Sequence, residues 1–142
     1  MKHFYAALAL TLAAAVPFGT ATAQDATVMP DLKGNWVGTS ETIVMGSALH
    51  HGEGKAEPRL SEVVFTLAIK AQDGRRFWGT VSSPQGNEVL LGVIGFDGKS
   101  IVARDGDGYM EGDLADDDTM NLIYSHSGES TVIAATTFKR QD

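Results

Sequence analysis

The feature that most constrains this chain is a succession of short strand-like runs separated by tight-turn signals. From residue 35 onward, β-branched, aliphatic and aromatic residues recur in short runs, and clusters rich in Gly, Asp, Asn or Pro separate them. Asp73-Gly74 and Asp97-Gly98 are typical of hairpin turns because both residue types tolerate positive φ angles, so successive strands are expected to be antiparallel. The eight expected strands cover residues 35–44, 60–70, 76–82, 89–95, 100–104, 109–114, 119–126 and 130–139.

These runs divide an inner face from an outer one. In residues 60–70, apolar and polar side chains alternate, with Val63, Phe65, Leu67 and Ile69 on one face and Glu62, Thr66 and Lys70 on the other.

A meander of eight antiparallel strands removes its exposed edges best by closing into a barrel. Glycines recur within the strands, at Gly38, Gly79, Gly92 and Gly112. Such glycines favour bends or close backbone approach, as barrel corners require. The sequence therefore predicts one all-β domain over residues 33–142, an eight-stranded antiparallel up-and-down β-barrel.

Residues 1–23 have the features of a signal peptide. Lys2 and His3 precede an apolar run over residues 4–16, and small residues then give a cleavage site after Ala23. The apolar run is shorter than the roughly 20 residues that cross a bilayer, so no membrane association is expected after cleavage. The protein is expected in the periplasm or outside the cell, with residues 24–32 as a flexible leader.

Composition excludes two classes of partner. The formal net charge is −7, and it becomes −8 once Lys2 leaves with the signal peptide. Nucleic acids and anionic membrane surfaces attract basic patches, so neither is expected as a partner. The sequence contains no cysteine, which excludes disulfides and a lipoprotein attachment site.

The first and last strands of the predicted barrel carry a short signature. Gly34-Asn35-Trp36 opens the first strand, and Arg140 follows the last. This pattern resembles the calycin superfamily, which includes lipocalins, avidins and fatty-acid-binding proteins. The resemblance implies that Trp36 plugs the closed end of the barrel, that Arg140 packs across it, and that Gly34 belongs to the same end. It also implies that the long connection over residues 45–59 partly covers an open mouth at the other end.

In a meander, successive turns alternate between the two ends. Residues 45–59, 83–87, 105–108 and 127–129 are therefore expected at the open mouth, and residues 72–75, 97–99 and 115–118 at the closed end. At the closed end, Arg75 and Arg76 are expected to neutralise the run Asp116-Asp117-Asp118 through surface pairs worth roughly 0–1 kcal/mol each.

The mouth loops carry candidate metal ligands. Imidazole and carboxylate groups hold zinc or a similar ion when three or four converge, and the candidates are His50, His51, His126, Asp105 and Asp107. The alternative is that these are solvated polar loops. Asp105-Gly106-Asp107-Gly108 does not match an EF-hand, because Tyr109 and Met110 stand where an oxygen ligand and a glycine are required. No cofactor is expected.

An eight-stranded barrel is just wide enough to be filled by side chains or to hold one small ligand. Small and hydroxylated residues on the inward faces favour a cavity with apolar walls and a few polar groups. The candidate ligand-binding residues are Ser40, Thr42, Phe65, Leu67, Tyr124 and Thr136. A filled, ligand-free barrel is the alternative.

We therefore expect an exported binding protein for a small apolar or amphipathic molecule. One alternative is a periplasmic protein–protein module, such as a protease or lysozyme inhibitor acting through residues 24–32. The other is a filled barrel with a metal-binding mouth. An enzyme is not expected, because no nucleophile elbow, recognisable carboxylate pair or H-E-x-x-H motif is present.

Overall fold

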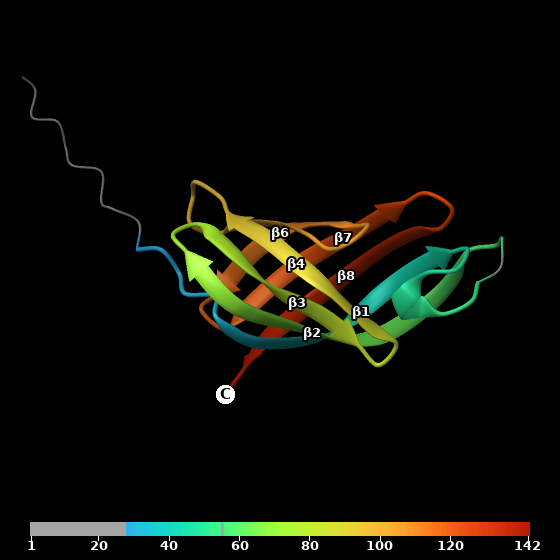
Figure 1. Cartoon of the computed structure of the whole chain (residues 1–142), viewed down its shortest axis with the longest axis horizontal. Coiled ribbons are helices and arrows are strands. Elements are labelled where there is room, and N and C mark those ends of the chain that lie inside the picture. The colour runs from blue at the N-terminus through green and yellow to red at the C-terminus, as the bar shows by residue number, and fades with distance from the viewer. Residues whose placement is uncertain (1–27, 55) are drawn as a thin grey trace, which may run out of the picture.

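The computed structural model describes residues 28–54 and 56–142, and it forms a closed barrel of antiparallel strands that follow one another in sequence order (Figure 1). A single turn of 3-10 helix, η1 (Leu49–His51), lies between the first two strands. The strands are β1 (Gly34–Met45), β2 (Arg59–Asp73), β3 (Arg76–Ser83), β4 (Gly86–Ile94), β5 (Ser100–Arg104), β6 (Tyr109–Asp116), β7 (Thr119–Ser127) and β8 (Thr131–Gln141). The predicted eight-stranded up-and-down barrel is confirmed.

The predicted signal peptide, residues 1–23, lies outside the described residues. Among the residues that are described, no helix has the length and apolar character needed to cross a membrane.

Pairing between the first and last strands closes the barrel. Trp36 stands opposite Arg140, Ser40 opposite Thr136, and Val44 opposite Val132. On its other edge β1 pairs with β2 over its length, so it lies between two neighbours. Closure leaves no strand with an open edge, which is how a sheet of this size avoids edge-to-edge association.

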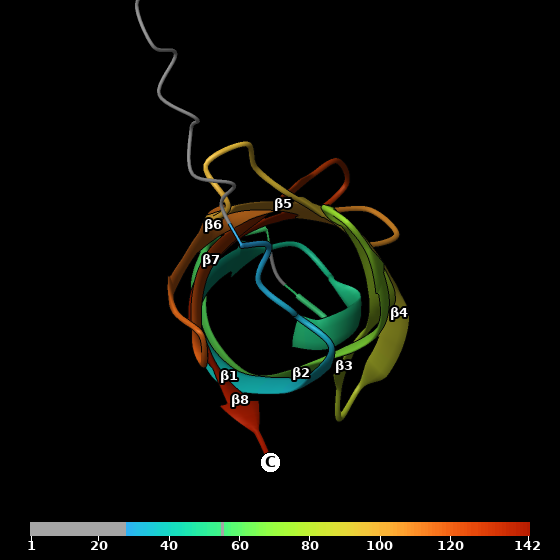
Figure 2. The same cartoon turned by 90° about the vertical axis from the view of Figure 1, so that its left-hand side faces the viewer.

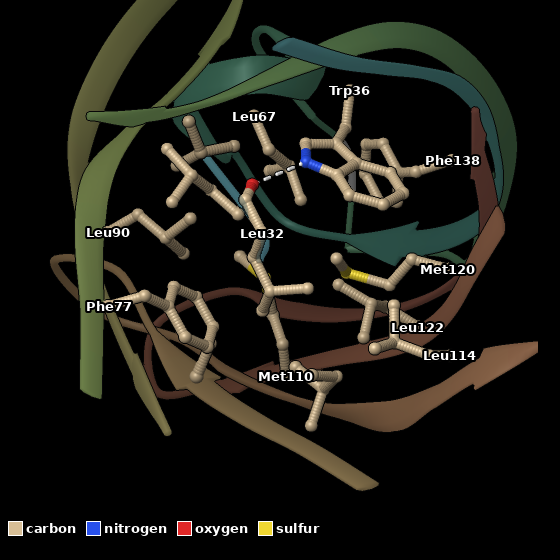
Figure 3. Packing of buried hydrophobic residues seen from close by; sticks show 14 of the residues in the cluster. Leu32, Trp36, Leu67, Phe77, Leu90, Met110, Leu114, Met120, Leu122 and Phe138 are labelled. Atoms are coloured by element: carbon tan, nitrogen blue, oxygen red, sulfur yellow. Dashed lines mark hydrogen bonds between the residues drawn. The ribbon is translucent and has the colours of Figure 1, made fainter. Parts of the chain in front are cut away.

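Every strand presents alternate residues to the interior, as the period of two requires. On β8, Val132, Ala134, Thr136 and Phe138 are buried while the residues between them are exposed. The core is an apolar cluster (Figure 3) that includes Leu32, Trp36, Leu67, Phe77, Leu90, Ile94, Ile101, Met110, Met120, Leu122 and Phe138.

Two of the strand glycines allow neighbouring backbones to approach closely. A Cβ atom at Gly79 would lie 1.9 Å from the carbonyl oxygen of Ala68, and one at Gly112 would lie 1.8 Å from that of Asn121. No side chain fits at either position, which confirms the predicted role of these glycines.

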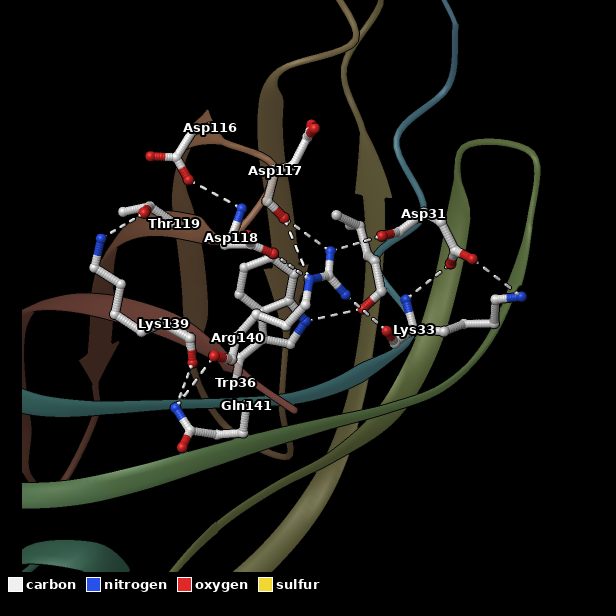
Figure 4. A network of polar contacts seen from close by, with 11 residues as sticks. Asp31, Lys33, Trp36, Asp116, Asp117, Asp118, Thr119, Lys139, Arg140 and Gln141 are labelled. Atoms are coloured by element: carbon white, nitrogen blue, oxygen red, sulfur yellow. Dashed lines mark hydrogen bonds and ion pairs between the residues drawn. The ribbon is translucent and has the colours of Figure 1, made fainter.

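Trp36 and Arg140 pack together at one end of the barrel (Figure 4). The Trp36 side chain is fully buried, and its indole N–H donates to the carbonyl oxygen of Leu32 at 2.9 Å. The Arg140 guanidinium lies over the indole, and it donates to the carbonyl oxygens of Asp31 and Lys33, each at 2.8 Å. Gly34 lies beside it with φ at +123°, which an L side chain rarely adopts.

The C-terminal part of the predicted leader is packed against the barrel. Leu32 is 1% exposed, and its backbone N–H donates to the Gln72 side chain at 2.8 Å. The Gln72 amide in turn donates to the carbonyl oxygen of Pro30 at 2.8 Å. Residues 30–32 therefore belong to the closed end rather than to a flexible leader, while residues 24–27 lie outside the described residues.

The predicted pairing of Arg75 and Arg76 with the Asp116-Asp117-Asp118 turn is wrong. Arg76 pairs with Asp73 within its own hairpin, and Arg75 donates to the carbonyl oxygen of Gly95. Arg140 takes the expected role instead, because its Nε atom lies 3.0 Å from Asp118 Oδ1. The order of the turns placed Arg75 and Arg76 at the same end as these acids. It did not reveal that Arg140, from the last strand, contacts them.

Candidate functional site

The open mouth is occupied by η1, which lies within the ring of strands in the end-on view of Figure 2. It is held there by contacts with loops that are distant in sequence. His50 reaches Ser83 and Glu88, while His126 reaches Asp107 and Ser130. The predicted gathering of these loops at one end of the barrel is therefore confirmed.

His50 anchors η1 to the barrel wall. Its side chain is buried, with Nδ1 at 2.7 Å from Ser83 Oγ and Nε2 at 3.2 Å from Glu88 Oε2. Its ring meets Phe65 edge to face, with centroids 5.1 Å apart. Since both ring nitrogens already have partners, His50 fixes the position of the turn rather than offering a free ligand atom.

Arg59 holds together the two parts of the mouth loop, residues 45–59. Its guanidinium donates to the carbonyl oxygens of Gly46 and His51 at 2.9 and 3.0 Å. His51 Nδ1 lies 3.0 Å from Ser61 Oγ. Burial lowers the pKa of His51, and the nearby charges of His50 and Arg59 lower it further, so His51 is neutral at pH 7.

A second network lies across the mouth. Asp107 accepts a hydrogen bond from the Tyr124 hydroxyl at 3.2 Å, and its other oxygen lies 3.1 Å from His126 Nδ1. His126 Nε2 lies 3.3 Å from Ser130 Oγ. Burial raises the pKa of Tyr124, and the neighbouring carboxylates raise it further, so the phenol remains a donor.

The metal candidates converge only in part. Among the described residues, Asp105 and Asp107 come together with Glu88, with carboxylate oxygens within 4.8 Å of one another. That group contains no histidine. His50, His51 and His126 instead bond to Ser83 and Glu88, to Ser61, and to Asp107 and Ser130.

Glu88 is a site residue that the sequence analysis missed. It stands opposite Val81 on β3, and both side chains face inward. The alternation of Glu88 with Leu90 and Ile94 along β4 would have placed it on the inner face, but the strand was expected to begin at residue 89.

Beneath η1 lies a cavity of about 50 Å³. A space of roughly 10–15 Å³ is enough for one water, so the cavity can hold a small molecule or a short chain. Its floor is apolar and its rim is polar. The lining includes Phe65, Leu67, Val81, Met110, Leu122 and Phe138 below, Ser40 and Thr136 on the wall, and His50, Glu88, Asp105, Asp107, Tyr124 and His126 at the rim.

Five of the six candidate ligand-binding residues line this cavity. The exception is Thr42, which is buried beside it and donates its hydroxyl to Ser40 Oγ at 2.9 Å. Thr42 therefore supports Ser40 from behind rather than facing a ligand.

The outer face of β3–β5 carries a second feature, a group of exposed apolar side chains. Trp78 is 46% exposed and stands opposite Leu91, which is 59% exposed. Val93 and Val102 form the neighbouring pair. Contiguous exposed apolar side chains of this kind are typical of interaction surfaces.

Comparison with known proteins found no matching family model, no matching curated protein and no matching solved structure.

Proposed function

We propose that this protein is an exported, calycin-type barrel that binds one small amphipathic molecule in the mouth cavity. The observation that carries the proposal is the cavity itself, with an apolar floor and a polar rim. A molecule that is apolar at one end and polar at the other fits such a gradient, because each end then meets groups of its own kind.

The lining supports burial of the apolar end of the ligand. Leu67, Leu122 and Phe138 are among the most buried side chains of the chain, so an apolar group beneath η1 is shielded from water. Removing apolar surface from water contributes about 25 cal/mol per Å². The small volume limits the buried part of the ligand to a short chain unless η1 moves outward.

The calycin type and export are supported by sequence features. The Gly34-Asn35-Trp36 opening and Arg140 resemble that superfamily, and the packing of Trp36 under Arg140 is the arrangement that the resemblance implies. Residues 1–23 read as a signal peptide.

Titration of the isotope-labelled chain with 1-butanol, followed by two-dimensional NMR, tests the binding proposal. We expect saturable shifts at the amides of Leu122, Ala134 and Phe138. Ala134→Leu fills the cavity and should abolish these shifts, whereas Ala135→Leu on the adjacent outward position should leave them unchanged. If neither 1-butanol nor any similar probe changes the chemical shifts of the cavity amides, the barrel is filled and the proposal is wrong.

A protein–protein module is the second candidate, favoured by the exposed apolar face of β3–β5. The leader is a weaker basis for this function than expected, since residues 30–32 are held at the closed end. A photo-crosslinking residue placed at Leu91 should trap a discrete partner in the host, while the same residue at Ile133, exposed on β8, serves as the matched control. Equal or absent crosslinking at the two positions would exclude this face as an interface.

A further inference from the structure

The charged side chains that line the cavity are of one sign. Glu88, Asp105 and Asp107 contribute carboxylates to the rim, and no Lys or Arg lines the cavity among the described residues. Within the same part of the chain, no ion pair joins a Lys or Arg to any of these three acids. Arg59 in the mouth loop is bonded to the carbonyl oxygens of Gly46 and His51, and Arg104, which precedes Asp105, lies over the Tyr109 ring.

The histidines only partly offset this charge. His50 contacts Glu88 and His126 contacts Asp107, but each also bonds a serine hydroxyl through its other nitrogen. Asp105 accepts the backbone N–H of Gly108 at 2.7 Å through Oδ1. Burial is the largest cause of the raised pKa of Tyr124, and the negative charges of Asp105, Asp107 and Glu88 raise it further, consistent with this excess.

A separate polar group inside the cavity has no hydrogen-bond partner among the described residues. Thr136 is only 9% exposed and lines the cavity wall, yet its hydroxyl makes no hydrogen bond to the described residues. No buried polar side-chain atom of the described chain is both sealed from solvent and unbonded, so this hydroxyl is accessible, and Thr136 lines the mouth cavity. Buried hydroxyls normally have a hydrogen-bond partner, and here the partner has to come from whatever fills the cavity.

The spacing of the rim carboxylates suits one head group in particular. An ammonium group has three N–H donors and no acceptor. A nitrogen at about 2.8 Å from each of three tetrahedrally placed acceptors puts those acceptors roughly 4.6 Å apart. The oxygens of Glu88, Asp105 and Asp107 lie within 4.8 Å of one another, which accommodates this arrangement.

We propose that the mouth selects a short aliphatic primary amine, whose ammonium group sits among Glu88, Asp105 and Asp107 and whose chain enters the cavity toward Thr136. This inference rests on the proposed binding function and names its ligand class. A cavity of about 50 Å³ suits a short chain such as that of n-butylamine or 3-amino-1-propanol. The second of these also supplies a hydroxyl for Thr136.

Calorimetric titration of the full mature barrel with n-butylamine, 1-butanol and butyrate at pH 7 and low salt tests this inference. We expect n-butylamine to bind at least tenfold more tightly than 1-butanol, butyrate not to bind, and the amine to weaken as sodium chloride is added. 3-Amino-1-propanol should lose its advantage over n-propylamine in Thr136→Val.

Matched variants separate the head-group site from the cavity. Glu88→Gln and Asp105→Asn should each weaken n-butylamine about tenfold and leave 1-butanol unchanged, while Glu62→Gln, on the exposed outer face of β2, should change neither. Thermal unfolding of each variant checks that the barrel remains folded.

The outcomes separate the inference from the function on which it rests. Equal affinity for the amine and the alcohol would overturn the amine inference and leave the binding function standing. Failure of all three probes, at concentrations that saturate comparable cavities, would overturn both. Titration with Ca²⁺ or Zn²⁺ alone provides the remaining arm: a metal ion that binds through Glu88 and Asp105 while the amine does not would identify the rim as a metal site and overturn the amine inference.

Discussion

The guanidinium carbon of Arg140 lies 4.2 Å from the centre of the Trp36 ring, which joins the last strand to the first through their side chains. The indole beneath it is fully buried, whereas the Arg140 side chain is 24% exposed. The cation caps the aromatic face while its N–H groups bond carbonyl oxygens on two segments, so one side chain closes the end of the barrel.

Replacing Arg140 should destabilise the barrel. Arg140→Met removes the charge-assisted hydrogen bonds to Asp31 and Lys33 and leaves their carbonyl oxygens without partners, and we expect a loss of about 2–3 kcal/mol in the free energy of unfolding. Arg140→Lys keeps the charge but not the planar fork, and should lose about half as much. Urea unfolding measures both, and Arg76→Gln, at an exposed pair, should leave stability unchanged. An Arg140→Met variant with an unchanged free energy of unfolding would contradict the role of Arg140 in closing the barrel.

A methyl group at Gly112 should be poorly tolerated. The added Cβ would lie 1.8 Å from the carbonyl oxygen of Asn121, so the strands have to separate. Overpacking of this kind costs about 1–3 kcal/mol or more. Gly128→Ala is the control, because its Cβ would be no closer than 3.9 Å to a neighbour. Equal thermal midpoints for the two variants would show that β6 and β7 are not in close contact at this position.

Leu32 should behave as a core residue although it precedes the first strand. Leu32→Ala removes a side chain that is 1% exposed, and we expect a loss of about 2–4 kcal/mol. Val28→Ala, at a position that is 89% exposed, should have no measurable effect. If the two variants unfold at the same denaturant concentration, residues 30–32 do not form part of the closed end.

The mouth loop should lose stability in mild acid. Burial lowers the pKa of His51 below its ordinary 6.5, so the unfolded chain takes up a proton at a pH where the folded protein does not. The stability that neutral His51 contributes is complete above pH 6.5 and falls as the pH drops below it. The thermal midpoint of the wild type should therefore decrease more between pH 8 and 5.5 than that of His51→Gln. Parallel decreases would show that another group controls the loop.

The barrel architecture could be predicted from the sequence because the alternation of apolar and polar residues and the chemistry of turns are local features. The strands between residues 100 and 126 were predicted to within two residues, since turns rich in Asp or Gly bound them on both sides. Alternation also placed Ser40, Leu67 and Thr136 on the inner face without any knowledge of long-range contacts. The exclusion of Thr42 from the cavity lining could not be predicted. It depends on a hydrogen bond between neighbouring inward side chains rather than on the strand face alone.

The chemistry of the mouth was harder to predict because it depends on how one long loop folds back. Topology correctly placed His50 and His126 at the same end, but η1 turns His50 into the wall against Ser83 and Glu88. No local pattern in residues 45–59 encodes that contact. The acids on the rigid hairpins, Asp105 and Asp107, were easier to predict, since their position follows from the strands on either side.

The seam between β1 and β8 has a consequence for synthesis of the chain. The bond from Arg140 to the carbonyl oxygen of Lys33 spans 107 residues, and no earlier residue can make it. Until residue 140 has left the ribosome, β1 has only one neighbour and β7 awaits its second, so a partial chain exposes two unpaired edges. Contacts this distant in sequence also form slowly. The barrel therefore cannot close until β8 has been synthesised, and the edges of β1 and β7 stay unpaired until then.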